Sequence, residues 1–247
     1  MNAKELTLPD LSSRDLPFID RGGLLRQLRE GGCGDWNLEG LGPLTVRGEG
    51  RAGRLLLAHG AGAGHDSTFL QRLRDALAAA GVQTMAFEFA YLQRMRREGR
   101  RRPPPNVEQM VDEMALWCDS VSHRDLPPLW LGGKSMGGRV ASMLAARHGA
   151  PGLVLCGYPF HPPNKPERLR LAHWPLLRCP TLVVQGSRDP FGSRDEVAGY
   201  VLPDTTRLHW LEEGDHDWRP RRASGRRQEA LIEEGAAVIA SFMAGHS

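Results

Sequence analysis

Short apolar runs alternate with longer amphipathic stretches along most of the chain, from about residue 55 to its C-terminal end. The apolar runs predict strands, which fall at residues 55–58, 83–89, 129–131, 153–156, 182–185 and 207–211. The stretches between them predict helices, at residues 67–80, 107–122, 136–148, 193–201 and 228–243. Strands and helices that alternate in this way favour a largely parallel sheet, with ligand loops at the carboxyl ends of its strands.

The first part of the chain follows a different pattern. Residues 1–33 are rich in Asp, Arg, Gly and Leu without a clean period, and we treat them as an N-terminal extension of unclear structure. Polar and apolar residues alternate over residues 36–47, which predicts hairpin strands followed by a turn at 51–53. No linker or internal repeat divides the remainder, so residues 34–247 are expected to form one domain.

Composition excludes some function classes. The residues are 40% hydrophobic and 25% charged, and the net charge of +3 is too small to predict binding to nucleic acid. No apolar run reaches the roughly 18 residues that would predict a membrane span. The four cysteines, at positions 33, 118, 156 and 179, form no CxxC motif, and residues 1–30 show no secretory signal. We therefore expect a reduced, cytoplasmic protein without a metal or cofactor, and find no signal for an oligomeric state.

A G-x-S-x-G motif, Gly133 to Gly137, lies between a predicted strand and a predicted helix. This setting places Ser135 on a tight turn, with its hydroxyl above the sheet and at the positive end of a helix. Two phosphate-binding motifs fail on spacing at similar places: a P-loop would need glycine where Pro128 stands, and a dinucleotide loop would need glycine at His65. The motif therefore predicts that Ser135 is a nucleophile.

A serine nucleophile needs a base and an acid that orients the base. Where the serine lies on a strand–turn–helix elbow of this kind, both residues follow later in the chain, the acid first. Asp189 follows the predicted strand at 182–185, and His216 follows the one at 207–211. Asp215 and Asp217 flank His216 and are alternative acids, although they are too near in sequence to be favoured. The expected catalytic residues are Ser135, Asp189 and His216.

An oxyanion hole requires two backbone N–H groups aimed at the developing negative charge. The first should belong to Met136, which directly follows the nucleophile. The second should come from the glycine-rich loop at residues 59–62, with Ala61 as the first choice and Gly62 as the second. The alternative interpretation of this loop is a turn that only packing requires.

These motifs resemble the α/β-hydrolase superfamily over about residues 55–243, through residues 59–62, 133–138, 157–159 and 214–216. The chain looks most like small, nearly cap-less dienelactone hydrolase-like enzymes. More narrowly, it is similar to a group that shares its domain with a subunit of the non-specific-lethal chromatin complex. The resemblance implies an α/β-hydrolase fold for residues 34–247, a mostly parallel central sheet flanked by helices with a minimal cap, a Ser135–Asp189–His216 triad and hydrolase chemistry. Dienelactone hydrolases proper carry a cysteine nucleophile, so Ser135 argues against that specific reaction.

Two regions bear on the substrate. The segment between Cys156 and Cys179 is short and proline-rich, which predicts a small cover whose pocket-lining candidates are Tyr158, Phe160, His161, Leu169, Leu171 and Trp174. Arginines cluster at 94–102, where Arg94 and Arg97 are substrate-binding candidates, and again at 219–227. Either these clusters are solvated charged loops, or they favour an anionic substrate or an acidic partner surface.

Three functions are compatible with these residues. The first is a serine hydrolase that cleaves a carboxylic ester or thioester of a small molecule. The second is a non-catalytic binding or scaffold module on the same fold, because a fold does not fix a function. The third is acyl transfer to an alcohol or peroxide, which differs from the first only in the acceptor.

Overall fold

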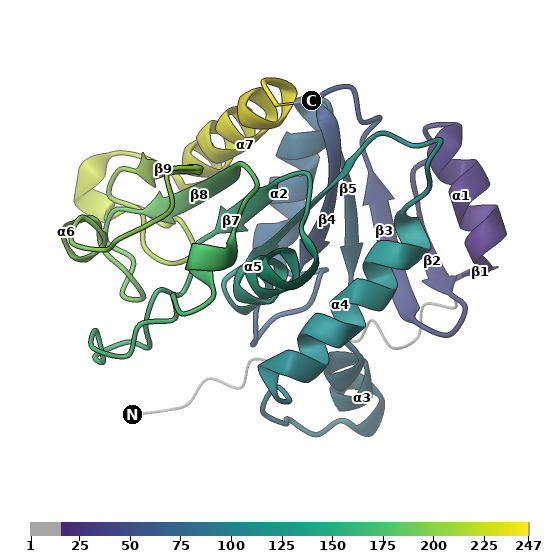
Figure 1. Cartoon of the computed structure of the whole chain (residues 1–247), viewed down its shortest axis with the longest axis horizontal. Coiled ribbons are helices and arrows are strands. Elements are labelled where there is room, and N and C mark those ends of the chain that lie inside the picture. The colour runs from purple at the N-terminus through teal and green to yellow at the C-terminus, as the bar shows by residue number, and fades with distance from the viewer. Residues whose placement is uncertain (1–15, 247) are drawn as a thin grey trace.

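The computed structural model describes residues 16–246, which form one mixed sheet with helices on both faces (Figure 1). Its strand order is β1-β2-β3-β5-β4-β6-β7-β8-β9. The strands are β1 (Phe18–Ile19), β2 (Gly34–Leu38), β3 (Gly42–Arg47), β4 (Gly53–Ala58), β5 (Val82–Phe87), β6 (Leu129–Lys134), β7 (Leu153–Cys156), β8 (Thr181–Gly186) and β9 (Thr206–Leu211). Strand β3 pairs antiparallel with both β2 and β5, whereas every pair from β5 to β9 is parallel.

Helices cover the two faces in separate groups (Figure 1). Side chains of α1 (Arg21–Arg29), α4 (Val107–Val121) and α5 (Met136–His148) share one hydrophobic cluster with the sheet. Side chains of α2 (Thr68–Ala79) and α7 (Gln228–Ala244) share the cluster on the opposite face. The remaining helical segments are α3 (Ala90–Glu98), α6 (Arg194–Val197), η1 (Trp174–Leu176) and η2 (Arg222–Ser224). Within residues 16–246, no helix has both the length and the apolar character needed to cross a membrane.

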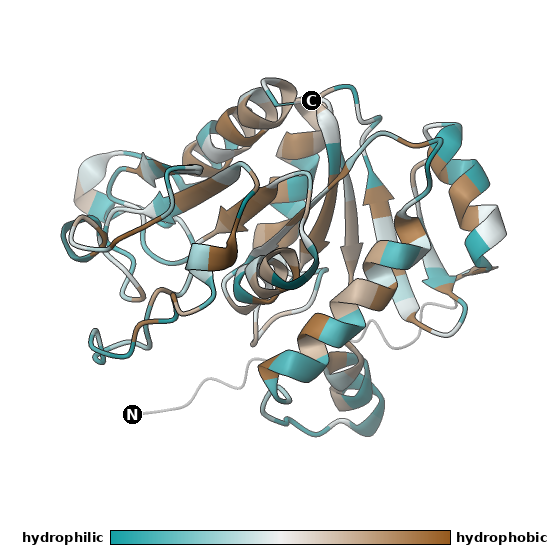
Figure 2. Ribbon diagram, in the orientation of Figure 1, coloured by the Kyte–Doolittle hydropathy of each residue, from teal (hydrophilic) through white to brown (hydrophobic). Residues whose placement is uncertain are grey.

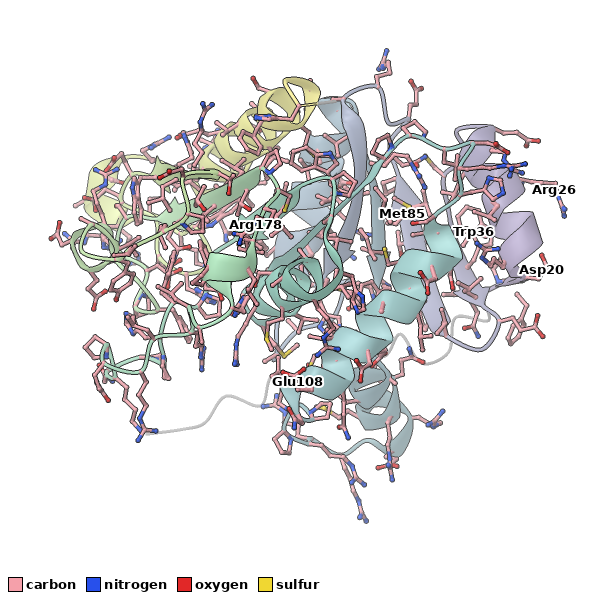
Figure 3. The ribbon with its side chains drawn as sticks, viewed as in Figure 1. Asp20, Arg26, Trp36, Met85, Glu108 and Arg178 are labelled. Carbon is pink, nitrogen blue, oxygen red and sulfur yellow. The ribbon has the colours of Figure 1, made fainter. Side chains whose placement is uncertain are left out.

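The core follows the central strands, which Figure 2 shows as the most hydrophobic part of the ribbon. Every residue of β5, β6, β7 and β8 is buried, because helices cover both faces of this part of the sheet. Met85 of β5 and Trp36 of β2, both labelled in Figure 3, belong to the cluster beneath α1 and α4. The sheet is thus apolar on both faces at its centre.

Most predicted elements are present, and two differ in a way that packing explains. The predicted helix at 193–201 is only α6, which stops at Val197. The arginine-rich residues after β5, expected as a loop, include helix α3, which buries Leu92 and Met95 and ends at Gly99 in a left-handed conformation. These two apolar residues, about one turn apart, give the helix a buried side.

Part of the predicted N-terminal extension lies within the sheet and its covering layer. Strand β1 pairs with β2, and α1 begins at the cap Asp20, whose carboxylate accepts a hydrogen bond from the Gly23 N–H at 2.6 Å. Leu24, Leu25 and Leu28 of α1 are buried. Residues 1–15 of the predicted extension lie outside the described residues. The hairpin expected over residues 36–47 is present as β2 and β3.

Candidate active site

Ser135 occupies a sharp turn between β6 and α5. Its backbone has φ 53° and ψ −116°, a conformation that residues other than glycine rarely adopt. Its N–H donates to the Cys156 carbonyl at 2.9 Å. This strained strand–turn–helix geometry is the elbow that the sequence motif predicts, with the serine at the N-terminal end of a 13-residue helix. The turn lifts the hydroxyl above the carboxyl edge of the sheet.

The glycines of the motif are required by close backbone packing. A Cβ at Gly133 would lie 2.6 Å from the Gly138 backbone nitrogen, because β6 and α5 almost touch at the elbow. A Cβ at Gly137 would lie 2.6 Å from the carbonyl oxygen of His59. The second contact matters for the site, because it draws the loop after β4 against the first turn of α5.

His216 reaches Ser135 from the loop after β9. Its Nε2 lies 2.9 Å from the Ser135 Oγ, and its Nδ1 lies 2.8 Å from Asp189 Oδ2. The His216 side chain is about one-fifth exposed, whereas Asp189 is fully buried. The phenyl ring of Phe191 packs on the imidazole, with ring centroids 4.3 Å apart. The three predicted residues therefore form one continuous hydrogen-bonded chain.

Two groups hold the Asp189 carboxylate in addition to His216. The backbone N–H of Phe191 donates to Oδ1 at 2.9 Å, and the Gln185 side-chain amide donates to Oδ2 at 3.0 Å. Buried carboxylates need such donors because burial removes their hydration. Gln185 and Phe191 had no role in the sequence-based prediction. The one available signal was a polar residue, Gln185, at the end of an otherwise apolar strand.

The two alternative acids have other partners. Asp215 Oδ1 accepts hydrogen bonds from the backbone N–H groups of Asp217 and Arg219, at 2.9 and 2.8 Å. Asp217 forms an ion pair with Lys134 at 3.3 Å. Asp215 therefore shapes the loop that carries His216, and the imidazole Nδ1 lies against Asp189.

Lys134, the second residue of the motif, is a buried cation beside the site. Burial lowers the pKa of its ammonium group, and the neighbouring carboxylates of Asp217 and Asp189 oppose this effect. Its Nζ also lies over the ring of Phe69, 5.5 Å from the centroid. Lys134 thus connects the elbow to the His216 loop, a contact that sequence spacing did not reveal.

The loop after β4 lies against the elbow, as the oxyanion-hole prediction requires. A Cβ on Gly60 would be 3.8 Å from the Ser135 Cβ, so Gly60 is a loop residue in direct contact with the serine. The Ala61 carbonyl accepts a hydrogen bond from the Tyr91 hydroxyl at 2.9 Å. Gly62 is exposed and has no neighbour within 4 Å of its Cβ position among the described residues. Met136 begins α5 directly after Ser135.

His59 stabilises this loop through the hydrogen bonds of its imidazole ring. The Phe89 backbone N–H donates to His59 Nε2 at 3.1 Å, so the ring proton lies on Nδ1, which donates to the Gly60 carbonyl at 2.7 Å. The ring is fully buried, and burial lowers its pKa to about 4. His59 is therefore a neutral structural group at neutral pH.

The aromatic residues expected to line a pocket are instead buried in the cover segment. Tyr158, Phe160 and Trp174 are at most 1% exposed and pack on one another, with ring centroids 5.0 to 5.8 Å apart. The Trp174 Nε1–H donates to the Tyr158 hydroxyl at 3.0 Å, and that hydroxyl donates to the Arg170 carbonyl. His161 is also buried, with its Nδ1 2.9 Å from the Pro162 carbonyl. In this structure these side chains stabilise the cover rather than line an open surface.

The arginine clusters are largely paired with carboxylates. Arg94 and Arg102 both bind Glu98, and Arg96 binds Asp66 and Glu88. In the second cluster, the ion pairs are Arg219 with Asp217, Arg221 with Glu213 and Arg226 with Glu234. Arg97 lines a polar pocket beside α3. The pairs reduce the positive charge on which the prediction of an anionic substrate was based.

Comparison with known proteins agrees with this architecture. A family model described as an alpha/beta hydrolase domain matches residues 51–244. The structure is similar to a dienelactone hydrolase from Anabaena variabilis, with a TM-score of 0.63 and 19% identity over 85% of this chain and 94% of that one. An alpha-beta serine hydrolase homologue from Coxiella burnetii gives a TM-score of 0.61 and 17% identity, over 83% and 96% of the two chains.

A third similar structure is XC6422 from Xanthomonas campestris, described as an a/b serine hydrolase without a lid. Its TM-score is 0.55 at 17% identity, and the match covers 82% of this chain and 93% of that one. At these identities the structural likeness shows the fold alone. The family match extends over most of the chain, from the turn before β4 to the end of α7, and the chain therefore belongs to the α/β-hydrolase domain family.

Proposed function

We propose that this protein is a serine hydrolase that cleaves a carboxylic ester or thioester through an acyl-enzyme on Ser135. The observation that carries the proposal is the hydrogen-bonded chain of Ser135, His216 and Asp189, with distances of 2.9 and 2.8 Å. A serine hydroxyl is a weak nucleophile unless an adjacent base removes its proton, and this arrangement supplies that base with a buried carboxylate behind it.

In the proposed first step, the Ser135 Oγ attacks the substrate carbonyl carbon and His216 Nε2 takes the hydroxyl proton. The carbonyl oxygen becomes an oxyanion, and the N–H groups of Met136 and of Ala61 or Gly62 stabilise it. The contact of Gly60 with Ser135 supports a donor from this loop. Asp189 stabilises the imidazolium through Nδ1.

Collapse of the tetrahedral intermediate breaks the bond to the leaving group. The imidazolium gives its proton from Nε2 to the departing alcohol or thiol, which leaves an ester between the acyl group and Ser135. A water molecule then attacks the acyl carbon while His216 takes one of its protons. The second collapse releases the acid and returns the proton to Ser135.

The substrate is expected to be a small ester or thioester, and the short cover segment argues against a bulky lipase-type lid. The cover runs from Gly157 to Pro180 with η1 as its helical element, and its aromatic side chains are used for packing. An anionic substrate remains a prediction. Equal rates on neutral and carboxylate-bearing esters of matched size, at low salt, would contradict the prediction of an anionic substrate.

Labelling with a fluorophosphonate probe tests the proposal, because the probe reacts with activated serines. The wild-type protein should become labelled, and Ser135→Ala should not. A folded wild-type protein that resists labelling would favour a non-catalytic binding module. Labelling that survives in Ser135→Ala would exclude Ser135 as the nucleophile.

A further inference from the structure

A polar pocket of about 540 Å³ lies beside the candidate active site, and none of the three triad residues lines it. Strands β2 and β3 form its floor, α2 and α3 contribute to its walls, and Glu88 lies at the end of β5. Strand β5 is separated from β6 by β4, so its end lies two strand spacings, roughly 10 Å, from the elbow. The pocket is thus near the site but distinct from it.

The alternation along β2 and β3 makes this pocket polar. Trp36, Leu38, Leu44 and Val46 belong to the hydrophobic cluster beneath α1 and α4. The residues between them line the pocket on the other face, among them Asp35, Asn37, Thr45 and Arg47. Since successive side chains of a strand point to opposite faces, one face of this hairpin is core and the other is a polar floor.

Arg74 of α2 lines the pocket as a buried cation that forms no ion pair with a carboxylate of the described residues. Arg74 is only 4% exposed, and its Nε and Nη1 have no hydrogen-bond partner among the described residues. Burial and the nearby charge of Arg47 lower the pKa of Arg74 to about 10, against the opposing effect of carboxylates such as Asp35, so the group is still charged at neutral pH. A buried unpaired charge is unfavourable, and an anion in the pocket would relieve it.

His65 is a second buried group that lines the pocket without a partner. The residue is 9% exposed, and its Nδ1 has no hydrogen bond within the described part of the chain. Burial lowers its pKa to about 3, so the ring is neutral and can donate a hydrogen bond to an oxyanion. Arg74 and His65 come from different segments, the helix α2 and the loop before it.

The carboxylates of the pocket are already paired with other arginines. Arg47 binds Asp35 with both Nη2–carboxylate distances at 3.0 Å. Arg96 lies 2.5 Å from Asp66 Oδ1 and 2.7 Å from Glu88 Oε1. With Arg74 and Arg97 the lining holds four arginines against three carboxylates, so it carries an excess of positive charge.

This excess of positive charge also bears on whether the pocket binds an anion or a metal ion. The ligand atoms of His65, Asp66 and Glu88 lie within 4.8 Å of one another, a spacing that could suit a cation. The guanidinium of Arg96 already occupies both carboxylates, however, and a cation would have to displace it. An anion needs no such displacement, because it can bind Arg74 and His65, whose buried nitrogens have no hydrogen-bond partner among the described residues. Glu88 Oε1 also has no hydrogen bond there, but the guanidinium of Arg96 lies 2.7 Å from it.

We propose that this pocket binds the carboxylate or phosphate group of a small molecule, with the guanidinium of Arg74 as its counter-charge and His65 as a further hydrogen-bond donor. The site does not depend on hydrolysis at Ser135. Carboxylates and phosphates share the geometry that a guanidinium recognises through two parallel hydrogen bonds.

Thermal unfolding with inorganic phosphate and with succinate tests the proposal, against sodium chloride of equal ionic strength. A ligand that binds only the folded state should raise the Tm of the wild-type protein, by about 2 °C or more at millimolar concentrations. Arg74→Met should remove this shift. Arg72→Met is the matched control, because Arg72 lies on the same helix but pairs with Glu229 outside the pocket, and it should retain the shift. A response to phosphate alone or succinate alone would identify the group that binds.

Two results would overturn the proposal: a wild-type protein that responds no more than to chloride, or an equal response in Arg74→Met. Should Arg74→Met fail to fold, Arg97→Met provides the test, because Arg97 is an exposed lining residue whose loss should weaken the shift. Magnesium or zinc chloride forms a further arm. Stabilisation by a cation that His65→Ala abolishes, without any oxyanion effect, would assign the pocket to a metal instead.

Discussion

The candidate active site lies at the carboxyl edge of the sheet, and the polar pocket lies over one face of β2 and β3. The two regions differ in how their polar groups are hydrogen-bonded. In the active site, each member of the chain from Ser135 to Asp189 has a hydrogen-bond partner within the protein. In the pocket, Arg74 and His65 are buried without one among the described residues. The first arrangement is complete before any ligand arrives, whereas the second is completed by a ligand.

This difference is the one that the two proposed roles require. A catalytic chain must be preorganised, because any reorganisation during the reaction would raise the barrier. A recognition pocket gains affinity and selectivity when its ligand satisfies groups that are otherwise unpaired.

Ser135→Ala should reduce ester hydrolysis by at least about 10⁴-fold, because the acyl-enzyme can no longer form. The substitution should not disturb the fold, since alanine keeps the Cβ that the elbow already accommodates. The measurement is kcat/KM with a p-nitrophenyl ester, and circular dichroism serves as the control for folding. Activity within a factor of ten of wild type would contradict the role of Ser135 as the nucleophile.

Asp189→Asn should lower kcat by roughly 10³- to 10⁴-fold, because an amide at this position no longer stabilises the imidazolium. Asp217→Asn is the matched variant: it removes a carboxylate from the same neighbourhood but leaves the His216–Asp189 contact intact. Its kcat should fall much less. If Asp217→Asn proves the more damaging of the two, the orienting acid is misassigned.

Glu88 should make the stability of the protein depend on pH. Burial raises the pKa of this carboxyl group from 4.5 to about 7, so the folded state holds the proton more tightly than the unfolded chain. Its contribution to stability is therefore full below about pH 4.5 and is lost as the pH rises to about 7, by up to about 3 kcal/mol.

Urea unfolding at pH 5 and pH 8 measures this effect, and Glu88→Gln provides the comparison. The variant should lose less stability than the wild-type protein between the two pH values, because its amide does not ionise. Contributions from other groups are common to both proteins and cancel in the difference. Identical pH dependence in the two proteins would show that Glu88 titrates normally.

Arg74→Met should raise stability by about 1–2 kcal/mol in a buffer without oxyanions, because it replaces a buried unpaired charge with an apolar side chain. Arg72→Met should change stability by no more than about 0.5 kcal/mol, since the ion pair it removes is solvent-exposed. Chemical denaturation of the three proteins gives the values. A marked loss of stability in Arg74→Met would mean that this arginine is satisfied in the folded protein.

Local patterns in the sequence were enough to predict the elements that carry the site. Helix α5 and strand β7 have the bounds that periodicity predicted, because both are bordered by glycine or by a sharp change in polarity. The order of Ser135, Asp189 and His216, each after its own strand, predicted residues that the structure brings within hydrogen-bonding distance. Parallel strands impose this outcome, since their carboxyl ends meet at one edge.

The less successful predictions concern burial, which depends on residues far apart in the sequence. Tyr158, Phe160 and Trp174 were candidates for a pocket lining, and composition could not show that they pack on one another. The arginines of α3 suggested a free positive surface, although Arg96 binds Asp66, 30 residues earlier in the chain. Pairing of this kind is absent from a local pattern.

The sequence by itself determined the α/β architecture, the elbow around Ser135 and the order of the proposed acid and base. These depend on periodicity, glycine spacing and strand direction, all of which are local properties. Only the tertiary structure decided that Asp189 rather than its alternatives lies against His216, that Lys134 joins the elbow to the His216 loop, and that Arg74 is buried without a partner. The physical reason is that the hydrogen-bond partners and the burial of a side chain depend on which distant segments of the chain come into contact on folding.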